Sequence, residues 1–176
     1  LITIRKNISG TGLQKVTEIY EANGLKETSL SNFESLLWSK KTIGIYELYM
    51  MDQRHMAAEI SKFTNSNNEY VRMEAQIASL RFQGITGLDF LNTLTNPLTE
   101  WQQLKLTDQL NVIAADTIIG LESWLGLNNP YVVHFALKIT ANYQQLHVHQ
   151  QVVQCLYHES EKVRAEAIST LSRIAD

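Results

Sequence analysis

The sequence predicts an all-α protein, and three observations lead to this fold class. Apolar residues recur at intervals of three and four, as they do at Val132, Phe135, Ala136 and Ile139. The strict alternation that marks a β-strand is hardly found. The 176 residues include only eight glycines and two prolines, which argues against a turn-rich β-fold.

The expected helices follow one another along the whole chain, separated by short breaks. Their ranges are 11–23, 31–51, 54–64, 69–82, 87–95, 99–113, 116–125, 130–143, 147–157 and 161–175. Thr11 or Ser9 caps the first helix and Gly24 ends it. The second is continuous in its apolar pattern, although Gly44 and the pair Lys40-Lys41 are candidate breaks within it.

Polar loop residues separate the later helices. The loops are 65–68, 96–97, 128–130 and 158–160, and they are rich in Asn, Ser, Pro and Glu. Pro97 and Pro130 both stand where a helix is expected to begin, a position at which the missing backbone N–H costs nothing.

A period of 31 residues runs through these helices. Phe63, Leu94, Leu125 and Leu156 are spaced at this interval, each near the end of an expected helix. Seven residues after each of them, the same interval relates Tyr70, Trp101, Val132 and Val163 at the start of the next helix. The repeating unit is therefore a pair of helices joined by short turns. Because one such hairpin cannot bury both its faces, neighbouring hairpins are expected to stack.

The starts of two repeats resemble those of HEAT repeats. Residues 69–75 and 161–167 share Val-Arg-x-Glu-Ala after a polar loop, similar to the family pattern Pro-x-Val-Arg-x-x-Ala-x-x-Ala-Leu. Residues 129–136 supply the proline of the pattern without its arginine. The resemblance covers roughly residues 31–176 and implies a right-handed α-solenoid of about four to five stacked antiparallel hairpins. Residues 1–30 form a separate N-terminal segment with one helix.

Three pairs of residues have expected roles in the stack. Ala75 and Ala167 are small where the two helices of a hairpin approach closely, and Val71 and Val163 fill the seam between repeats. The resemblance implies that Arg72 and Arg164 reach an acidic group or main-chain carbonyls of the adjoining repeat. A solvated arginine is the alternative.

The charge balance excludes nucleic acid as a partner. The formal net charge is −3 and the isoelectric point is near 6.0, whereas a nucleic-acid binder needs a basic surface. Some HEAT-like proteins are DNA glycosylases with a basic concave face. Here Lys105 and Lys138 are the only cationic residues between Phe82 and His158, so this part of the chain has no basic surface that could bind nucleic-acid phosphates.

No catalytic or metal-binding motif is present, and we expect neither an enzyme nor a cofactor. His147 and His149 point in opposite directions on a helix and cannot share an ion. Cys155 is expected to be a small buried residue rather than a nucleophile. Asp108, Asp116 and Glu122 are not aligned for acid–base work, and no glycine-rich nucleotide or acyl-transfer motif occurs.

What remains is a surface for binding a protein or peptide. In stacked hairpins the second helices line the concave side, and their outward positions form a predicted polar stripe. Its members are Arg54, Ser61, Asp89, Asn92, Asp116, Ser123, His147, Gln151, Gln154 and His158. Tyr49, Tyr131, Tyr143 and Tyr157 are candidate aromatic anchors, with a place in the core or seam as the alternative.

The sequence therefore favours a non-catalytic protein-interaction scaffold. The period also resembles that of phycobilin-lyase-type repeats, which implies as one alternative an accessory protein that holds a tetrapyrrole. Another is a structural spacer in a membrane-anchored protein. No run of 18 apolar residues occurs, so we expect the repeat domain to make no direct membrane contact and to be cytoplasmic. Leu1-Ile2-Thr3-Ile4 before Arg5-Lys6 allows an anchor upstream, with an ordinary chain end as the other reading.

Overall fold

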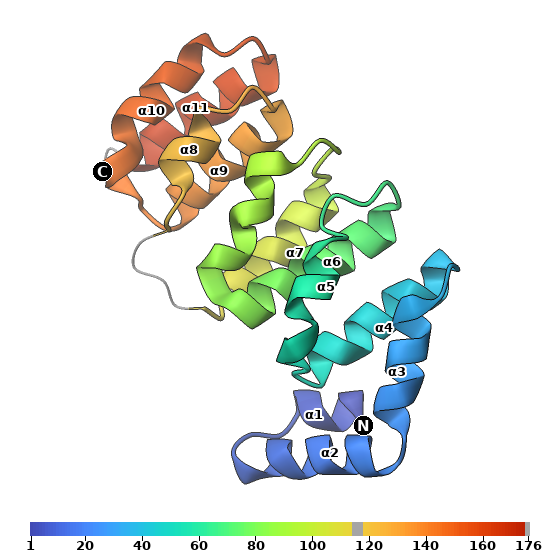
Figure 1. The fold of residues 1–176 in the computed structure, drawn as a ribbon. Coiled ribbons are helices and arrows are strands. Elements are labelled where there is room, and N and C mark those ends of the chain that lie inside the picture. The colour runs from blue at the N-terminus through green and yellow to red at the C-terminus, as the bar shows by residue number, and fades with distance from the viewer. Residues whose placement is uncertain (114–117, 175–176) are drawn as a thin grey trace. The chain divides into compact units, whose positions relative to one another are not determined.

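The computed structural model describes residues 1–113 and 118–174. Within these ranges the chain forms α-helices and short 3₁₀ helices and no strand, which confirms the all-α prediction (Figure 1). The chain divides into two compact units, residues 1–87 and 88–176. Each unit is described by itself.

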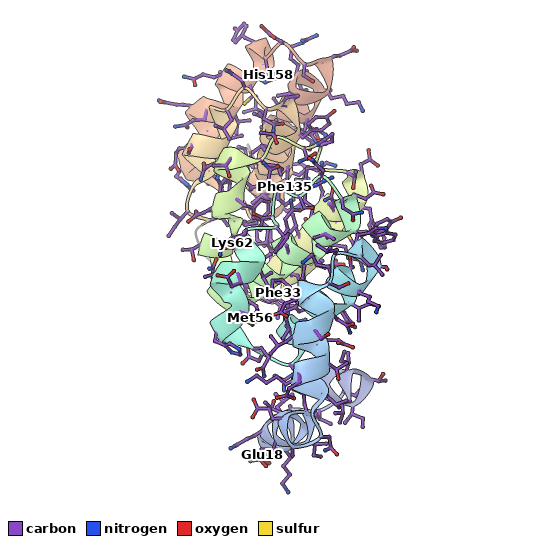
Figure 2. The ribbon with its side chains drawn as sticks, turned by 45° about the vertical axis from the view of Figure 1, so that its right-hand side comes forward. Glu18, Phe33, Met56, Lys62, Phe135 and His158 are labelled. Atoms are coloured by element: carbon purple, nitrogen blue, oxygen red, sulfur yellow. The ribbon has the colours of Figure 1, made fainter. Side chains whose placement is uncertain are left out.

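The N-terminal unit is built around α4. Its elements are α1 (Ile2–Lys6), α2 (Thr11–Ala22), α3 (Leu25–Glu34), α4 (Trp38–Met50), η1 (Arg54–Met56), α5 (Ala57–Ser61), α6 (Glu69–Gln83) and the start of η2 (Gly84–Thr93). Helix α4 packs against α3 and α6, and α5 packs against α6. The core contains Phe33, Ile45, Leu48, Ile60 and Ala75, and Figure 2 places Phe33 inside this unit.

The continuous helix expected over 31–51 is wrong, because the chain leaves the helix between α3 and α4. Ser35 has extended backbone angles, with φ −57° and ψ 142°, and Leu37 is extended as well. The suspected breaker Gly44 instead lies in the middle of α4. A Cβ there would come within 2.3 Å of the backbone nitrogen of Phe33. Glycine is thus required by the close approach of α3 and α4.

The C-terminal unit is built around α9. Its elements are the remainder of η2, α7 (Glu100–Leu110), α8 (Leu121–Leu125), α9 (Pro130–Asn142), η3 (Leu146–Val148), α10 (His149–Gln154), η4 (Cys155–Tyr157) and α11 (Glu161–Ile174). Helix α9 packs against α8 and α11. From Val132 onward its apolar residues are completely buried, and they include Phe135, labelled in Figure 2. Hydrogen bonds from Tyr143 to Asn111 and from Lys138 to Gln103 join α9 to α7.

A distinctive turn occurs once in each unit with the same geometry. Asp52 and Gln144 are the two non-glycine residues with positive φ among the residues described, at 56° and 49°. The next residue, Gln53 or Gln145, donates its backbone N–H to the carbonyl five residues earlier. A 3₁₀ turn and a short α-helix follow in both places. This recurrence supports the repeating hairpin predicted from the sequence.

An arginine clamp recurs on α6 and α11, the long helices that come after each turn and its short helix. Arg72 Nη1 donates to the carbonyls of Ser66 and Asn67, and Arg164 Nη1 donates to those of His158 and Glu159. The acceptors lie in the loop directly before the arginine's own helix. The arginines thus bond to main-chain carbonyls, as one form of the prediction had it, but in the preceding loop of the chain, and neither arginine is merely solvated.

The helix caps show that the repeat is not strictly regular. Asn68, Thr99 and Asn129 each accept hydrogen bonds from the first turn of α6, α7 and α9, and Ser160 precedes α11. The intervals are 31, 30 and 31 residues. The residues predicted at the starts of the helices, spaced strictly by 31, therefore shift by one position relative to the helix caps between α7 and α9. Its members Tyr70 and Trp101 are exposed, whereas Val132 and Val163 are buried.

The predictions of buried residues are confirmed, whereas two predictions of helices are not. Ala75, Ala167 and Val163 are fully buried, Val71 is nearly so, and Cys155 is a buried free thiol. Burial raises the pKa of the Cys155 thiol. The first 30 residues contain α1, α2 and the beginning of α3 where one helix was predicted. The helix expected over 87–95 is wrong in type, since this stretch belongs to the 3₁₀ segment η2.

Candidate functional site

Part of the predicted polar stripe is assembled in the C-terminal unit. The hydroxyl of Ser123 on α8 donates to the Asn92 amide oxygen on η2 at 3.2 Å. His147 Nε2 on η3 lies 3.4 Å from a carboxylate oxygen of Glu122 on α8. These contacts place η2, α8 and η3 side by side with exposed polar residues. Asp89 and Gln154 are also exposed, with no distance linking them to the others.

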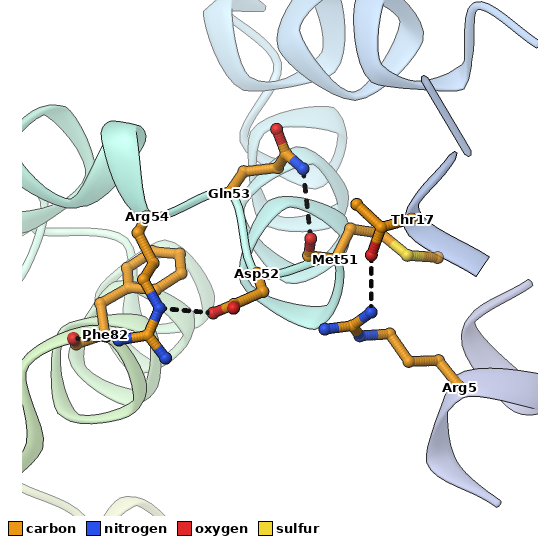
Figure 3. Close-up of polar contacts among 7 residues, drawn as sticks. All are labelled: Arg5, Thr17, Met51, Asp52, Gln53, Arg54 and Phe82. Atoms are coloured by element: carbon orange, nitrogen blue, oxygen red, sulfur yellow. Dashed lines mark hydrogen bonds and ion pairs between the residues drawn. The ribbon is translucent and has the colours of Figure 1, made fainter. Parts of the chain in front are cut away.

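Three other members of the predicted stripe form hydrogen bonds or ion pairs with nearby residues of the chain. Arg54, in the N-terminal unit, pairs with Asp52 at 2.9 Å and donates to the carbonyl of Phe82 (Figure 3). Ser61 bonds to the carbonyl of Ala58 within its own helix. His158 Nδ1 accepts from the backbone N–H of Ser160, which shapes the loop before α11.

The last two members do not support an outward stripe. The Gln151 side chain was expected to face outward, but its amide oxygen is buried and accepts no hydrogen bond from the residues described. Asp116 lies outside the described residues. The ten predicted residues therefore do not form one binding surface, and the part that is assembled is the contact between η2, α8 and η3.

The predicted tyrosine anchors have four different environments. Tyr49 is buried and donates a hydrogen bond to Glu74. Tyr143 is half-buried and bonds to Asn111. Tyr157 is 86% exposed, and Tyr131 is 45% exposed. Of the four, only Tyr131 lines a pocket found among the residues described.

That pocket lies in the C-terminal unit, at the first turns of three helices. Its volume is about 420 Å³, within the range typical of ligand sites. Thr99, Glu100 and Gln103 line it from α7 and its cap; Pro130, Tyr131 and His134 from α9; and Ser160 and Lys162 from the start of α11, with Leu98 completing the lining. Apolar surface and hydrogen-bonding groups are thus both present.

Side-chain contacts fix the deeper polar groups of the pocket. Gln103, which is 6% exposed, donates to the carbonyl of Leu98 and accepts from Lys138 Nζ at 3.3 Å. His134 Nε2 lies 3.5 Å from a carboxylate oxygen of Glu166 on α11. Burial, followed by the nearby charge of Lys138, lowers the pKa of His134 despite this carboxylate. Near neutral pH the pocket therefore contains an uncharged imidazole.

Two of the three lysines of this unit lie at the pocket, together with two carboxylates. Lys162 lines the pocket, and Lys138 bonds to its wall residue Gln103. Lys105 lies over the ring of Trp101 at 4.6 Å, and neither of these residues lines the pocket. Glu100 lines the pocket as well, and Glu166 lies against His134.

Sequence reasoning missed this pocket because its walls come from distant segments. Trp101 and Tyr131 are each the second residue of a helix and follow the capping residues Thr99 and Asn129. Trp101 is 56% exposed. The helix caps could have revealed the pocket. When the repeats are aligned on their caps rather than on the strict 31-residue interval, Trp101 corresponds to Tyr131 instead of Val132.

No protein-family model matches the chain, and neither do the curated proteins or the solved structures with which it was compared. Among the residues described, no three His, Cys, Asp or Glu side chains are grouped to hold a metal ion. No described helix combines the length and apolar character needed to cross a membrane.

Proposed function

We propose that this chain is a non-catalytic protein-interaction module, and that it binds a segment of a partner protein in the pocket between the first turns of α7, α9 and α11. Membership of the HEAT-like class, with four to five hairpins in a right-handed solenoid, is part of the proposal. The recurring turns and arginine clamps support it, since the same local bonds occur in two of the proposed repeats.

One observation carries the choice of site. Tyr131 forms part of the wall of a pocket about 420 Å³ in volume and remains 45% exposed. Tyrosine and tryptophan are the residues that most often supply the binding energy of protein interfaces, particularly beside a pocket. Trp101 stands at the equivalent position of the neighbouring helix α7 and is likewise half-exposed. An extended segment can place an apolar side chain against Tyr131 and Pro130.

The polar part of the lining suits a peptide as well. The hydroxyl of Ser160 and the ammonium of Lys162 are hydrogen-bond donors next to the apolar wall. The main chain of an extended segment offers unpaired carbonyls to such donors. The stripe predicted on the second helices is less favoured, because Asn92 and Ser123 bond to each other and the amide oxygen of Gln151 is turned inward.

The proposal is tested by selecting ligands from a display library of short random peptides on the full chain. The expected result is a set of peptides whose affinity falls about tenfold or more in Tyr131→Ala, as happens when an interface anchor is truncated. Tyr157→Ala is the matched control, since this more exposed tyrosine lies outside the pocket. Failure to select any peptide, or equal loss in both variants, would contradict the proposal.

A further inference from the structure

A separate pocket lies in the N-terminal unit, where α1, α2, α3 and the end of α4 meet. Its volume is about 270 Å³, slightly below the range of about 300–1,000 Å³ found for drug-sized ligands. Apolar side chains of Ile2, Leu25 and Met51 form part of the lining. The pocket therefore suits a small molecule or a single side chain of a partner.

One polar group at this pocket is buried without a hydrogen bond. Tyr20 lines the pocket and is 3% exposed, and its hydroxyl has no hydrogen-bond partner among the residues described. Buried polar groups nearly always have such a partner, because burying them unpaired is unfavourable. A ligand that bonds to this hydroxyl would remove the unfavourable burial.

A carboxylate and a second hydroxyl lie close to Tyr20. The Ser29 hydroxyl donates to Glu47 Oε2 at 2.8 Å, and both residues line the pocket. Burial raises the pKa of Tyr20, whereas the nearby Ser29 lowers it. No hydrogen bond to the other carboxylate oxygen of Glu47 is found among the residues described. Three oxygen atoms that can accept a hydrogen bond therefore gather at one end of the pocket.

The charged side chains that act on Tyr20 are all carboxylates. After burial and Ser29, the charges of Glu47, Glu27 and Glu21 raise its pKa further, and no cation opposes them. Lys26 offsets one of the three, since it lies 3.8 Å from Glu21. In the part of the chain described, no ion pair is formed by Glu47. The polar end of the pocket thus favours a cation.

We propose that this pocket binds a primary ammonium group on a short alkyl chain, as in a small amine or in the lysine side chain of a partner protein. An ammonium group has three N–H donors and no acceptor, so it can pair with Glu47 and donate to the oxygens of Ser29 and Tyr20. The alkyl chain packs against the apolar part of the lining. This site is independent of the peptide pocket in the C-terminal unit.

Methyl groups of methionine measure this binding. Among the four methionines of the chain, Met51 lines the pocket, whereas Met56 and Met73 do not. In NMR spectra of the full chain labelled at its methionine methyl groups, n-butylamine at pH 7 should shift the Met51 signal and leave those of Met56 and Met73 in place. n-Butanol has the same alkyl chain without the charge and should bind about tenfold more weakly or worse.

Two conservative variants test the polar groups. Tyr20→Phe removes a hydroxyl that bonds to no described residue, so it should weaken n-butylamine binding about three- to tenfold without lowering the melting temperature. Glu47→Gln keeps the shape and removes the charge, and should weaken binding about tenfold or more. Tyr70→Phe and Glu18→Gln are the matched controls at exposed positions outside the pocket, and should leave the affinity unchanged.

A blocked lysine, N-acetyl-lysine methylamide, distinguishes the two sources of the ammonium group. If it shifts Met51 as n-butylamine does, the pocket accepts the lysine side chain of a protein; if only n-butylamine does so, the ligand is a small free amine. The proposal is wrong if neither amine shifts Met51, if n-butanol binds as tightly as n-butylamine, or if Glu47→Gln leaves the affinity unchanged. Circular dichroism confirms that each variant is folded.

Discussion

Arg164 donates a hydrogen bond from Nη1 to the carbonyl oxygen of His158 at 2.8 Å, and this bond ties the last helix to the loop that precedes it. Arg72 makes the equivalent bond to Ser66 in the N-terminal unit. In both places the same nitrogen, Nη1, donates to two successive carbonyls of the loop before the helix.

The arginine clamp makes a prediction about stability. Arg72 is 4% exposed, so Arg72→Ala removes a buried side chain and the donor to the carbonyls of Ser66 and Asn67, and should lower the free energy of unfolding by about 1.5–3 kcal/mol. Arg164→Ala should cost less, because Arg164 is only half-buried. Urea denaturation followed by circular dichroism measures both. A larger loss for Arg164 than for Arg72 would contradict the ranking.

The contact between α3 and α4 predicts an intolerance of side chains at Gly44. Gly44→Ala places a methyl group against the backbone of Phe33 and Ser29, neither of which can yield as a flexible side chain would. We expect a loss of about 1–3 kcal/mol, the usual cost of overpacking, or more. Gly126→Ala is the control, since its nearest neighbours lie at 3.6 Å. Thermal melts showing equal stability for the two variants would refute this packing.

Leu94 and Leu125 test the buried ends of the second helices. Each is 5% exposed, and truncation to Ala should cost about 2–5 kcal/mol, as for other buried leucines. Leu146→Ala provides the comparison, because this leucine is 58% exposed and should lose much less. The measurement is again urea denaturation, and unchanged midpoints for Leu94→Ala and Leu125→Ala would remove both residues from the core.

The lowered pKa of His134 should make the stability of the protein depend on pH. Because its pKa is lower in the folded protein than in the unfolded chain, the unfolded chain binds the proton more readily. The contribution of the neutral imidazole is therefore complete above the unfolded pKa of about 6.5 and is lost as the pH falls below it. His134→Gln should lose less stability than the native chain between about pH 7.5 and about pH 5.5. Thermal melts of the native chain and of His134→Gln over this pH range measure the difference. Identical dependence of stability on pH in the two proteins would contradict the prediction.

The fold class and most helix positions were predictable because they depend on local signals. Periodic apolar residues, helix caps and the prolines are visible in the sequence, and α2, α6, α9 and α11 lie close to the expected ranges. The break at Ser35 was not predictable in this way. The apolar pattern continues across this break. Only the packing of α3 against α4 shows why position 44, in the middle of α4, must be a glycine.

The candidate site was less predictable than the fold. A strict interval of 31 residues pairs Trp101 with the buried Val132, whereas the shorter interval between α7 and α9 pairs it with the exposed Tyr131. That one-residue difference hides the correspondence between the two exposed aromatic residues. The pocket residues are equally scattered along the sequence, and only the folded unit brings Gln103, Tyr131 and Lys162 to one pocket.

A partner segment is proposed to occupy the pocket at the first turns of α7, α9 and α11. Hydrogen–deuterium exchange of the full chain, measured by mass spectrometry with and without a selected peptide, locates the bound segment. Binding in the pocket should slow exchange at residues 98–103, 130–134 and 160–164. Slowing confined to residues 89–93, 121–125 and 147–154 would place the ligand on the second helices and refute the proposed site.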